Sequence, residues 1–392
     1  MTSPSPPTFL FAGGGTGGHL YPGIAIARAL AAIQPGSRAL FLCSDRPIDA
    51  KILTDEGVEF RPTPARPFGV RPRALVRFLR SWGASVRFGR EVIREARARG
   101  PVHIVALGGF VAAPVVQAGR VERVPVTMVN LDAIPGKANR LIARRIASAP
   151  VRGAGIFTTL AVPPSHTYAA GWTLVPPIVR PAALARGTPA ECRSRLGLDP
   201  DRPTLMVTGG SLGASTINTL LLDFARSRPE ALKGWQVLHQ TGAKQGDQMG
   251  PQLESAYAAA GARAIVVPFV AAMGDWWGAA DLAISRAGAG SVAEAWANAV
   301  PTVFLPYPHH RDQHQRHNAE PLTRAGGDGG GGAVLLTDHV DAAANLAAAA
   351  PILTDLLGDA SRRARMREAL RSLGPADGAE RIARAIVGAA GG

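Results

Sequence analysis

Cysteine and long apolar runs are scarce in this sequence. Its 392 residues include two cysteines, Cys43 and Cys192, which lie far apart. This pair excludes a disulfide framework or a cysteine-based zinc site and suits a reducing compartment. Since no run reaches about 18 apolar residues without a charge, we expect no helix that spans a bilayer. The first residues, MTSPSPPTFLFAGGG, lack a basic segment, so we expect no signal peptide there.

Length and pattern indicate two α/β domains. A chain of 392 residues exceeds what one hydrophobic core usually organises. Patterns of short buried strands alternate with helical stretches before residue 174 and again after residue 203, and the residues between are rich in proline. We expect parallel sheets in an N-terminal domain at 1–180, a linker at 181–203 and a C-terminal domain at 204–392. The last helix could pack back on the N-terminal domain.

The positive charge is concentrated in one segment. The formal net charge is +14, and residues 61–100 hold eleven arginines and two glutamates. Apolar side chains alternate with these arginines, a mixture that favours an interfacial helix on an anionic membrane surface. Nucleic acid would also accept the charge, but no nucleic-acid-binding motif surrounds it, so we expect no nucleic acid partner. A solvated, arginine-rich helix is the alternative.

A glycine-rich turn, AGGGTGGHLYPG at 12–23, lies between a short apolar run and a helical pattern. Glycines at a strand-to-helix turn let a ligand approach free N–H groups, where the helix dipole favours negative charge. Gly13, Gly15 and Gly18 also fit the dinucleotide fingerprint, but its acidic residue would have to be Asp45, which lies too far along the chain. His19 has no role in that fingerprint. A flexible turn without a ligand is the other alternative.

A second turn of the same kind is SRAGAGSVAE at 285–294. Gly288 and Gly290 allow close approach, and the helix that follows offers free N–H groups to a diphosphate. Glu294 lies in its first turns, where a carboxylate can accept hydrogen bonds from a ribose diol. The alternative is that Glu294 only complements the helix dipole.

Amides and histidines crowd residues 306–322. Gln315 and Asn318 lie three apart, on one face if the segment is helical, and amides suit sugar hydroxyls. Metal binding would use the nearby histidines, but Asp312 is the only carboxylate in their immediate run, and we expect no metal. The acidic pair in Asp199-Pro200-Asp201 precedes a strand and is interpreted as a turn. The four histidines are His309, His310, His314 and His317.

These motifs together resemble the MurG family of glycosyltransferases, from about residue 8 to about residue 325. The matching segments are GGTGGHLYPGIAIARAL, GGFVAAP at 108–114, GGSLGASTIN at 209–218, HQTG at 239–242, FVAAM at 269–273, SRAGAGSVAEAWANAVPTVFLPYP and HQRHNAEPL. The resemblance implies a GT-B fold, in which two Rossmann-like domains face a deep cleft. It implies inverting transfer of N-acetylglucosamine from UDP-GlcNAc to the muramoyl 4-hydroxyl of undecaprenyl-linked lipid I, giving lipid II for peptidoglycan. It implies no cofactor, and peripheral attachment to the cytoplasmic face of the cell membrane.

The resemblance also implies residue roles. His19 is the implied catalytic base, and its ordinary pKa near 6.5 suits that task; Asp132 is the next candidate. Phe269 and the backbone of Val270 would meet uracil, Glu294 the ribose, and the turn at 289–293 the diphosphate. The full donor set is Thr16, Gly17, Gly18, Asp132, Arg180, Ser211, Phe269, Val270, Met273, Arg286, Ala289, Gly290, Ser291, Val292, Ala293, Glu294, His314, Gln315 and Asn318. The acceptor set is Gly14, Gly15, Phe110 and Asn139.

Three segments depart from the family pattern, all in the N-terminal half or at its joint. Val129–Asp132 replaces His-Glu-Gln-Asn, Phe110 replaces tyrosine, and Pro176–Arg180 replaces Gly-Asn-Pro-Val-Arg. The family uses this half for its acceptor. Two further hypotheses therefore stay open: a GT-B enzyme that uses UDP-GlcNAc on another acceptor, and a sugar-nucleotide-binding protein without catalysis. A nicotinamide enzyme is the fourth.

Overall fold

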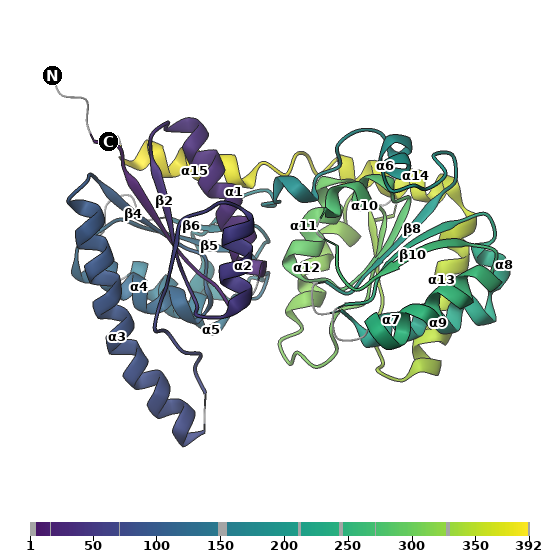
Figure 1. Cartoon of the computed structure of the whole chain (residues 1–392), viewed down its shortest axis with the longest axis horizontal. Coiled ribbons are helices and arrows are strands. Elements are labelled where there is room, and N and C mark those ends of the chain that lie inside the picture. The colour runs from purple at the N-terminus through teal and green to yellow at the C-terminus, as the bar shows by residue number, and fades with distance from the viewer. Residues whose placement is uncertain are drawn as a thin grey trace. The chain divides into compact units, whose positions relative to one another are not determined.

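The computed structural model describes residues 5–15, 17–69, 71–147, 155–210, 213–242, 246–270, 272–326 and 330–390. The chain divides into two compact units. Unit 1 comprises Met1–Arg180 with Asp377–Gly392, and unit 2 comprises Pro181–Ala376. The expectation of two Rossmann-like α/β domains with parallel sheets is confirmed (Figure 1).

Unit 1 is built on a seven-stranded parallel sheet in the order β3-β2-β1-β4-β5-β6-β7. Its two central strands are buried along their whole length, as expected for a sheet covered by helices on both faces. The order reverses direction between β1 and β4, and ligands of open α/β sheets bind outside the carboxyl ends of strands at such a point. The strands are β1 (Thr8–Ala12), β2 (Arg38–Cys43), β3 (Phe60–Pro62), β4 (Val102–Ala106), β5 (Val126–Asn130), β6 (Gly155–Thr158) and β7 (Thr173–Leu174).

Six α-helices surround this sheet in the described part of unit 1. The last of them comes from the C-terminus of the chain and packs on the first, where Ile382 and Ile386 share a core with Leu20 and Ile24. An antiparallel bridge between Ile178 and Asp377 joins the two chain segments of the unit. The helices are α1 (Gly17–Ile33), α2 (Pro47–Asp55), α3 (Pro72–Arg97), α4 (Gly109–Val121), α5 (Lys137–Ala147) and α15 (Gly378–Ala390), with a 3-10 turn η1 (Thr167–Ala169).

Helix α3 is buried only in its second half. Its buried residues begin at Ser85, whereas Leu75, Val76 and Leu79 are large apolar side chains exposed to solvent. In Figure 1 the first half of α3 projects beyond the sheet of its own unit. The described residues of unit 1 therefore leave these three apolar side chains uncovered. None of the helices in the described ranges is long and apolar enough to span a membrane.

Unit 2 repeats the strand order of unit 1, as β10-β9-β8-β11-β12-β13, all parallel. Strand β8 takes the place of β1 and β11 the place of β4, so the order again reverses between them. The strands are β8 (Thr204–Thr208), β9 (Gln236–Gln240), β10 (Arg263–Val267), β11 (Leu282–Ser285), β12 (Thr302–Phe304) and β13 (Ala333–Leu335). The helices are α6 (Pro189–Arg195), α7 (Ser215–Ser227), α8 (Pro229–Leu232), α9 (Gly246–Ala259), α10 (Met273–Ala279), α11 (Ala289–Ala297), α12 (His314–Thr323), α13 (Ala342–Gly358) and α14 (Ala360–Arg371), with a 3-10 turn η2 (Pro181–Ala183).

Residues 181–203, suggested by the sequence as a linker, are packed into unit 2. Helix α6 contacts α10, and the buried guanidinium of Arg193 donates to Asp281 Oδ2 at 2.7 Å and to the Ala279 carbonyl at 3.1 Å. Further along, the Asp199 carboxylate accepts a bond from the Asp201 N–H at 3.0 Å, so this acidic pair forms the expected turn. The segment is thus part of a folded unit. Its prolines, which suggested a linker, lie in turns and at the start of a helix.

Candidate active site

The first glycine loop leaves β1 at the point where the strand order reverses. A buried carboxylate holds it: Asp49 Oδ2 accepts bonds from the Gly15 N–H at 2.7 Å, the Ser44 N–H at 3.1 Å and the Ser44 hydroxyl at 2.6 Å. A Cβ on Gly14 would lie 2.4 Å from that oxygen, and Gly14 and Gly15 both have positive φ. Glycine is therefore required here by close approach as well as by backbone conformation.

Sequence reasoning missed Asp49 and Ser44, and it weighed the neighbouring Asp45 instead. Asp45 is exposed and forms an ion pair with Arg66 at 2.6 Å, so it is not placed at the glycine loop. The available signal was an acidic residue in the first turn of the helix that follows the second strand, at Asp49. Its contact with Gly15 joins residues 34 apart in sequence, which no local pattern predicts.

His19 lies in the first turn of α1, directly after this loop. The residue is half-buried, and its Nδ1 atom is shielded from solvent without a hydrogen-bond partner in the described ranges. Burial lowers the pKa of His19 below its ordinary 6.5, against the opposing charges of Asp132 and Asp49. The imidazole is therefore neutral at neutral pH, the form that can accept a proton.

The second glycine loop follows β4 and touches the first. Gly108 and Gly109 have φ of 99° and 73°. A Cβ on Gly109 would lie 3.2 Å from the Gly14 carbonyl oxygen and 3.9 Å from the His19 ring, and one on Gly108 would lie 2.5 Å from Asn139 Oδ1. The two loops and His19 thus form one surface at the carboxyl ends of β1 and β4.

Two further predicted acceptor residues border this surface. The ring of Phe110 would contact a Cβ on Gly15 at 3.1 Å, and Arg46 lies 5.6 Å from the ring centroid while donating to the Gly15 carbonyl at 2.7 Å. Asn139 donates to Asn130 Oδ1 at 3.0 Å, and its own Oδ1 is buried with no partner among the described residues. The structure therefore brings Gly14, Gly15, Phe110 and Asn139 together around His19.

Unit 2 presents two helix N-termini after its own glycine loops. Helix α11 starts at N-cap Gly288 without a side-chain cap, and a Cβ on Gly288 or Gly290 would meet nothing within 4 Å. The first N–H groups of such a helix have no intrahelical partner and attract anions. Helix α7 also starts without a side-chain cap, after the loop of Gly209, Gly210 and Gly213. Ser211 in that loop, like Thr16 in unit 1, lies outside the described residues.

Several other predicted donor residues of unit 2 differ in chemical type. Glu294 is half-buried, and its Oε2 accepts a bond from the Trp277 indole N–H at 2.8 Å, which orients the carboxylate. Phe269, after β10, is 55% exposed, although it is a large apolar ring. Val270 and Met273 beside it are buried. An exposed ring at a strand end is available to stack on a flat base.

Two predicted donor residues have internal roles in the structure. Arg286 is buried, and its guanidinium donates to Asp338 Oδ2 at 2.7 Å, to the Leu305 carbonyl at 2.9 Å and to the Thr216 hydroxyl at 2.7 Å. Asn318 is fully buried and donates to the Ala287 carbonyl at 3.2 Å. Asn318 thus holds the backbone just before α11, and Arg286 ties the end of β11 to the segment after β12.

The remaining predicted residues of α12 are closer to solvent. Gln315 Oε1 accepts a bond from the Tyr307 N–H at 2.8 Å, and His314 Nδ1 lies 2.8 Å from Asp312 Oδ1. The His310 and His314 rings lie 4.3 Å apart. Across the described ranges, no group of three histidine, cysteine or acidic residues could hold a metal ion.

Comparison with known proteins relates this geometry to a family. Residues 9–150 match the Glycosyltransferase family 28 N-terminal domain, and residues 204–348 match its C-terminal domain. A relative from Leifsonia xyli, named UDP-N-acetylglucosamine--N-acetylmuramyl-(pentapeptide) pyrophosphoryl-undecaprenol N-acetylglucosamine transferase, is 37% identical over 386 residues, 96% of this chain and 97% of the relative. The chain belongs to the MurG family.

Other comparisons agree with this assignment. A relative of the same name from Chlorobaculum parvum is 33% identical over 96% of this chain and 98% of its own length. The crystal structure of Acinetobacter baumannii MurG has a TM-score of 0.67 and 23% identity, covering 98% of this chain and all of that one, which shows a common GT-B fold. As a MurG-family member the chain is a glycosyltransferase, and the nicotinamide hypothesis is set aside.

The departures from the MurG pattern are partly structural. Val129 and Asn130 are fully buried, and Asn130 donates to Thr158 Oγ1 at 3.0 Å and to the Asp132 carbonyl at 2.7 Å. Asp132 is half-buried. Arg180, the last residue of the first segment of unit 1, has its guanidinium 4.4 Å from the centroid of the Tyr21 ring. Asp132 is thus the charged side chain of the altered motif that lies near His19.

Proposed function

We propose that this MurG-family chain transfers N-acetylglucosamine from UDP-GlcNAc to the muramoyl 4-hydroxyl of lipid I, giving lipid II. The names of its relatives support this donor and this lipid-linked acceptor. The structural observation that carries the proposal is the open N-terminus of α11, which has no side-chain cap. Glu294 lies in the same helix, and the exposed ring of Phe269 belongs to the same unit. Together they supply an anion site, a diol acceptor and a base platform.

Donor binding would use unit 2. The diphosphate would accept bonds from the free amides of Ala289–Ser291, the ribose would donate to Glu294, and uracil would stack on Phe269. Val270 would contribute backbone, and Met273 would pack beneath it. Gln315 and His314 would contact sugar hydroxyls, and Asn318 would act through the Ala287 backbone that it holds. Fixed amides at a helix N-terminus stabilise the charge that develops on departing UDP without any metal.

Acceptor activation would use unit 1. His19 would take the proton of the 4-hydroxyl as its oxygen attacks the anomeric carbon, while the bond from that carbon to UDP breaks with inversion. The resulting imidazolium would be stabilised by the charges of Asp132 and Asp49, which already oppose the effect of burial. Gly108, Gly109 and Phe110 would shape the surface that receives the muramoyl sugar.

Lipid I is membrane-bound, and α3 offers a means of attachment. Arg73, Arg77 and Arg80 recur on one face of its exposed half, and the exposed apolar side chains Leu75, Val76 and Leu79 lie on the face beside it. Such a helix would lie in the interface of the anionic cytoplasmic leaflet, with its apolar face among the acyl chains. This would place the chain as a peripheral protein on the face where UDP-GlcNAc is available.

Product analysis tests the reaction. With radiolabelled UDP-GlcNAc and purified lipid I, the label should move into lipid II, and the His19→Ala variant should transfer far less. A second candidate, transfer to another acceptor, is favoured by the burial of Val129 and Asn130, since neither side chain reaches the surface. If lipid I is not glycosylated while other lipid-linked sugars are, this candidate replaces the first. If UDP-GlcNAc is only hydrolysed, or if no acceptor receives the label, both candidates are contradicted.

Sedimentation tests the membrane attachment. Vesicles with anionic lipid should carry the protein down, and high salt or charge reversal at Arg73, Arg77 and Arg80 to glutamate should reduce this. Reversal of Arg226, Arg228 and Arg263 is the matched control, because these arginines are exposed on unit 2 and form no ion pair in the described structure. Equal binding to neutral and anionic vesicles would show that α3 is only a solvated helix.

A further inference from the structure

Three polar side chains of unit 2 bind one another in its interior. The side chain of Asp338, after β13, is fully buried, and Arg286, directly after β11, donates to its Oδ2 at 2.7 Å. The hydroxyl of Thr216, in the first turn of α7, also donates to Asp338 Oδ2 and accepts a bond from Arg286 Nη2 at 2.7 Å. Arg286 lies 70 residues from Thr216 and 52 from Asp338 in sequence, so the fold alone brings the three together.

This cluster joins two helix N-termini. Arg286 lies two residues before Gly288, the N-cap of α11, and Thr216 is the second residue of α7. Neither helix has a side-chain cap, so the first N–H groups of both are open to an anion. The two helices follow β8 and β11, the neighbouring strands between which the strand order reverses. One ion pair and one hydroxyl therefore set the spacing between α7 and α11.

Arg286 also fixes the segment that leads to α12. Its Nη1 donates to the carbonyls of Leu305 at 2.9 Å and Pro306 at 3.2 Å, and its guanidinium lies 5.8 Å from the centroid of the Tyr307 ring. The Tyr307 N–H in turn donates to Gln315 Oε1 at 2.8 Å. Both terminal nitrogens of Arg286 thus bind protein oxygens. Arg286 would therefore reach a donor through the backbone that it holds.

The carboxylate of Asp338 is held by its own loop as well. Its Oδ1 accepts bonds from the Val340 N–H at 2.8 Å and from the Asn345 amide at 3.1 Å. Burial raises the pKa of Asp338, but hydrogen bonds from Thr216 and Arg286 outweigh this effect and hold that pKa below its ordinary value. The carboxylate is therefore charged at neutral pH. One oxygen is fixed by the loop before α13, and the other binds the elements that carry α7 and α11.

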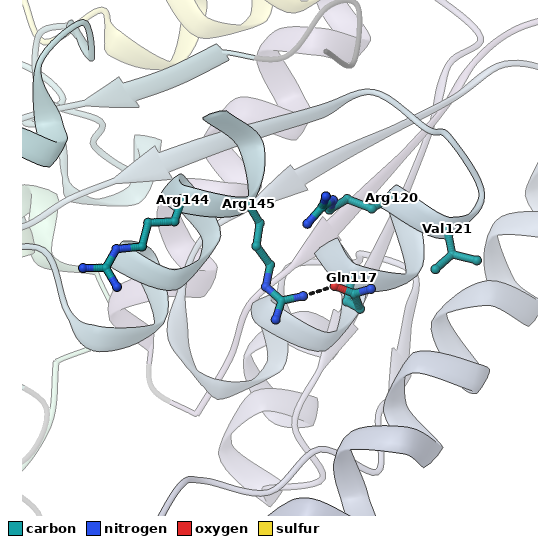
Figure 2. A pocket seen from close by; sticks show the side chains of 5 residues that line it. All are labelled: Gln117, Arg120, Val121, Arg144 and Arg145. Carbon is teal, nitrogen blue, oxygen red and sulfur yellow. Dashed lines mark hydrogen bonds between the residues drawn. The ribbon is translucent and has the colours of Figure 1, made fainter. Parts of the chain in front are cut away.

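Burial gives this contact its influence on position. On unit 1, Arg145 donates to the Gln117 amide beside a shallow cavity that is open to solvent, where water competes for the same groups (Figure 2). Arg286 and Asp338 are both buried, and a buried charge that loses its partner is left uncompensated. The pair therefore resists any movement of α7 relative to α11 that would separate its charges.

We propose that Asp338 is a positioning residue for the donor, which acts through Arg286 and Thr216 to hold the N-termini of α7 and α11 at the spacing that a diphosphate requires. This inference rests on the proposed binding of UDP-GlcNAc in unit 2. It predicts that loss of Asp338 weakens contacts to the diphosphate. Contacts to uracil and ribose, assigned above to Phe269 and Glu294, should remain.

The opposite end of β11 offers a matched control. Asp281 directly precedes that strand, and its Oδ2 accepts bonds from Arg193 Nη2 at 2.7 Å and from the Thr204 N–H at 2.8 Å. This second arginine–aspartate pair holds the amino ends of β8 and β11, whereas the glycine loops follow their carboxyl ends. Asp281→Asn should therefore lower stability, as Asp338→Asn does, without an effect on diphosphate binding.

Affinities for UDP and uridine separate positioning from stability. Calorimetric titration measures UDP, and competition against UDP measures uridine. Asp338→Asn should weaken UDP binding by about tenfold to hundredfold and leave uridine binding unchanged, whereas Asp281→Asn should change neither. Urea unfolding should show both variants to be less stable than wild type. Equal ratios of UDP to uridine affinity in the two variants would overturn the role. Tighter UDP binding by Asp338→Asn would also overturn it, because Arg286 would then act on the diphosphate by its charge.

Thr216 provides a second pair of variants in case Asp338→Asn does not fold. Thr216→Val removes the hydroxyl from a side chain of similar size and should weaken UDP binding by about threefold to tenfold, whereas Thr216→Ser keeps the hydroxyl and should bind UDP like wild type. Equal UDP affinity in these two variants would contradict the positioning role. If wild type binds UDP no more tightly than uridine, the proposed donor site fails together with this role. If wild type prefers UDP and every variant keeps that preference, the donor site stands and the positioning role alone fails.

Discussion

Replacing Asp49 should both destabilise the fold and slow the reaction. Asp49→Ala leaves the Gly15 N–H and both donors of Ser44 without their acceptor. An unsatisfied buried donor costs about 1–3 kcal/mol, and the Ser44 hydroxyl can rotate to another acceptor, so a loss of about 2–5 kcal/mol is expected. Asp49→Asn keeps an acceptor but loses the charge, and should cost about half as much.

The control lies on the same helix. Asp55 is exposed and pairs with Lys51, at 2.8 Å and four residues away, so Asp55→Ala should cost about 0.5 kcal/mol or less. Urea unfolding measures both variants. Because Gly15 lies four residues before His19, Asp49→Ala should also lower turnover by about tenfold or more, with the affinity for UDP unchanged. If Asp49→Ala unfolds at the same urea concentration as Asp55→Ala and keeps its turnover, the carboxylate does not hold the loop.

Three other predictions concern single side chains. Glu294→Ala should weaken UDP binding by about 1–3 kcal/mol in a calorimetric titration, and unchanged affinity would remove Glu294 from the ribose. His19→Ala should lower turnover by about 10²–10⁴-fold with donor affinity retained, and a variant that keeps most of its turnover would make the histidine structural. The pH profile of wild-type turnover should show an acid limb below pH 6.5, because burial lowers the pKa of His19. Burial lowers the pKa of His103 to about 4 and that of His239 to about 3. Below about pH 6.5 the unfolded chain therefore binds protons at these two histidines that the folded chain does not bind. Stability is therefore full above pH 6.5 and falls by about 2–3 kcal/mol per histidine by pH 4.5, which urea unfolding at the two pH values measures; a His239→Gln variant with an equally steep decline would argue against this cause.

The sheets could be predicted because their central strands have a clear sequence pattern. Runs such as those of β1 and β4 are mostly apolar and buried along their whole length, which suits strands covered on both faces, and glycines follow them closely. The short edge strands β3, β7 and β13 have two or three residues each, too few to form a pattern. The glycine loops could be predicted for the same reason, because each follows a buried central strand directly.

Individual roles were harder to predict than loops. Asp49 contacts the glycine loop at Gly15, 34 residues away in sequence, and this contact depends on how β1 and β2 pair. Arg286 and Asn318 have the chemistry of ligand-binding residues, yet both are bound to protein carbonyls. Residue type states what a side chain can bind, and only the fold decides whether backbone or ligand satisfies it.

Because α15 packs on α1, the core of unit 1 can be completed only after most of the chain has been synthesised. Ile382 and Ile386 close a core whose other residues, including Leu20 and Ile24, leave the ribosome first. The core of unit 1 therefore stays open on one apolar face until α15 has been made, whereas unit 2 can finish folding before it. A chain that stops short of α15 would still contain every glycine loop and His19, but its first unit would expose that face. Such a fragment should depend on chaperones or aggregate, and we expect that cutting the chain at residue 180 would not yield a folded first unit, because α15 would be lost from it.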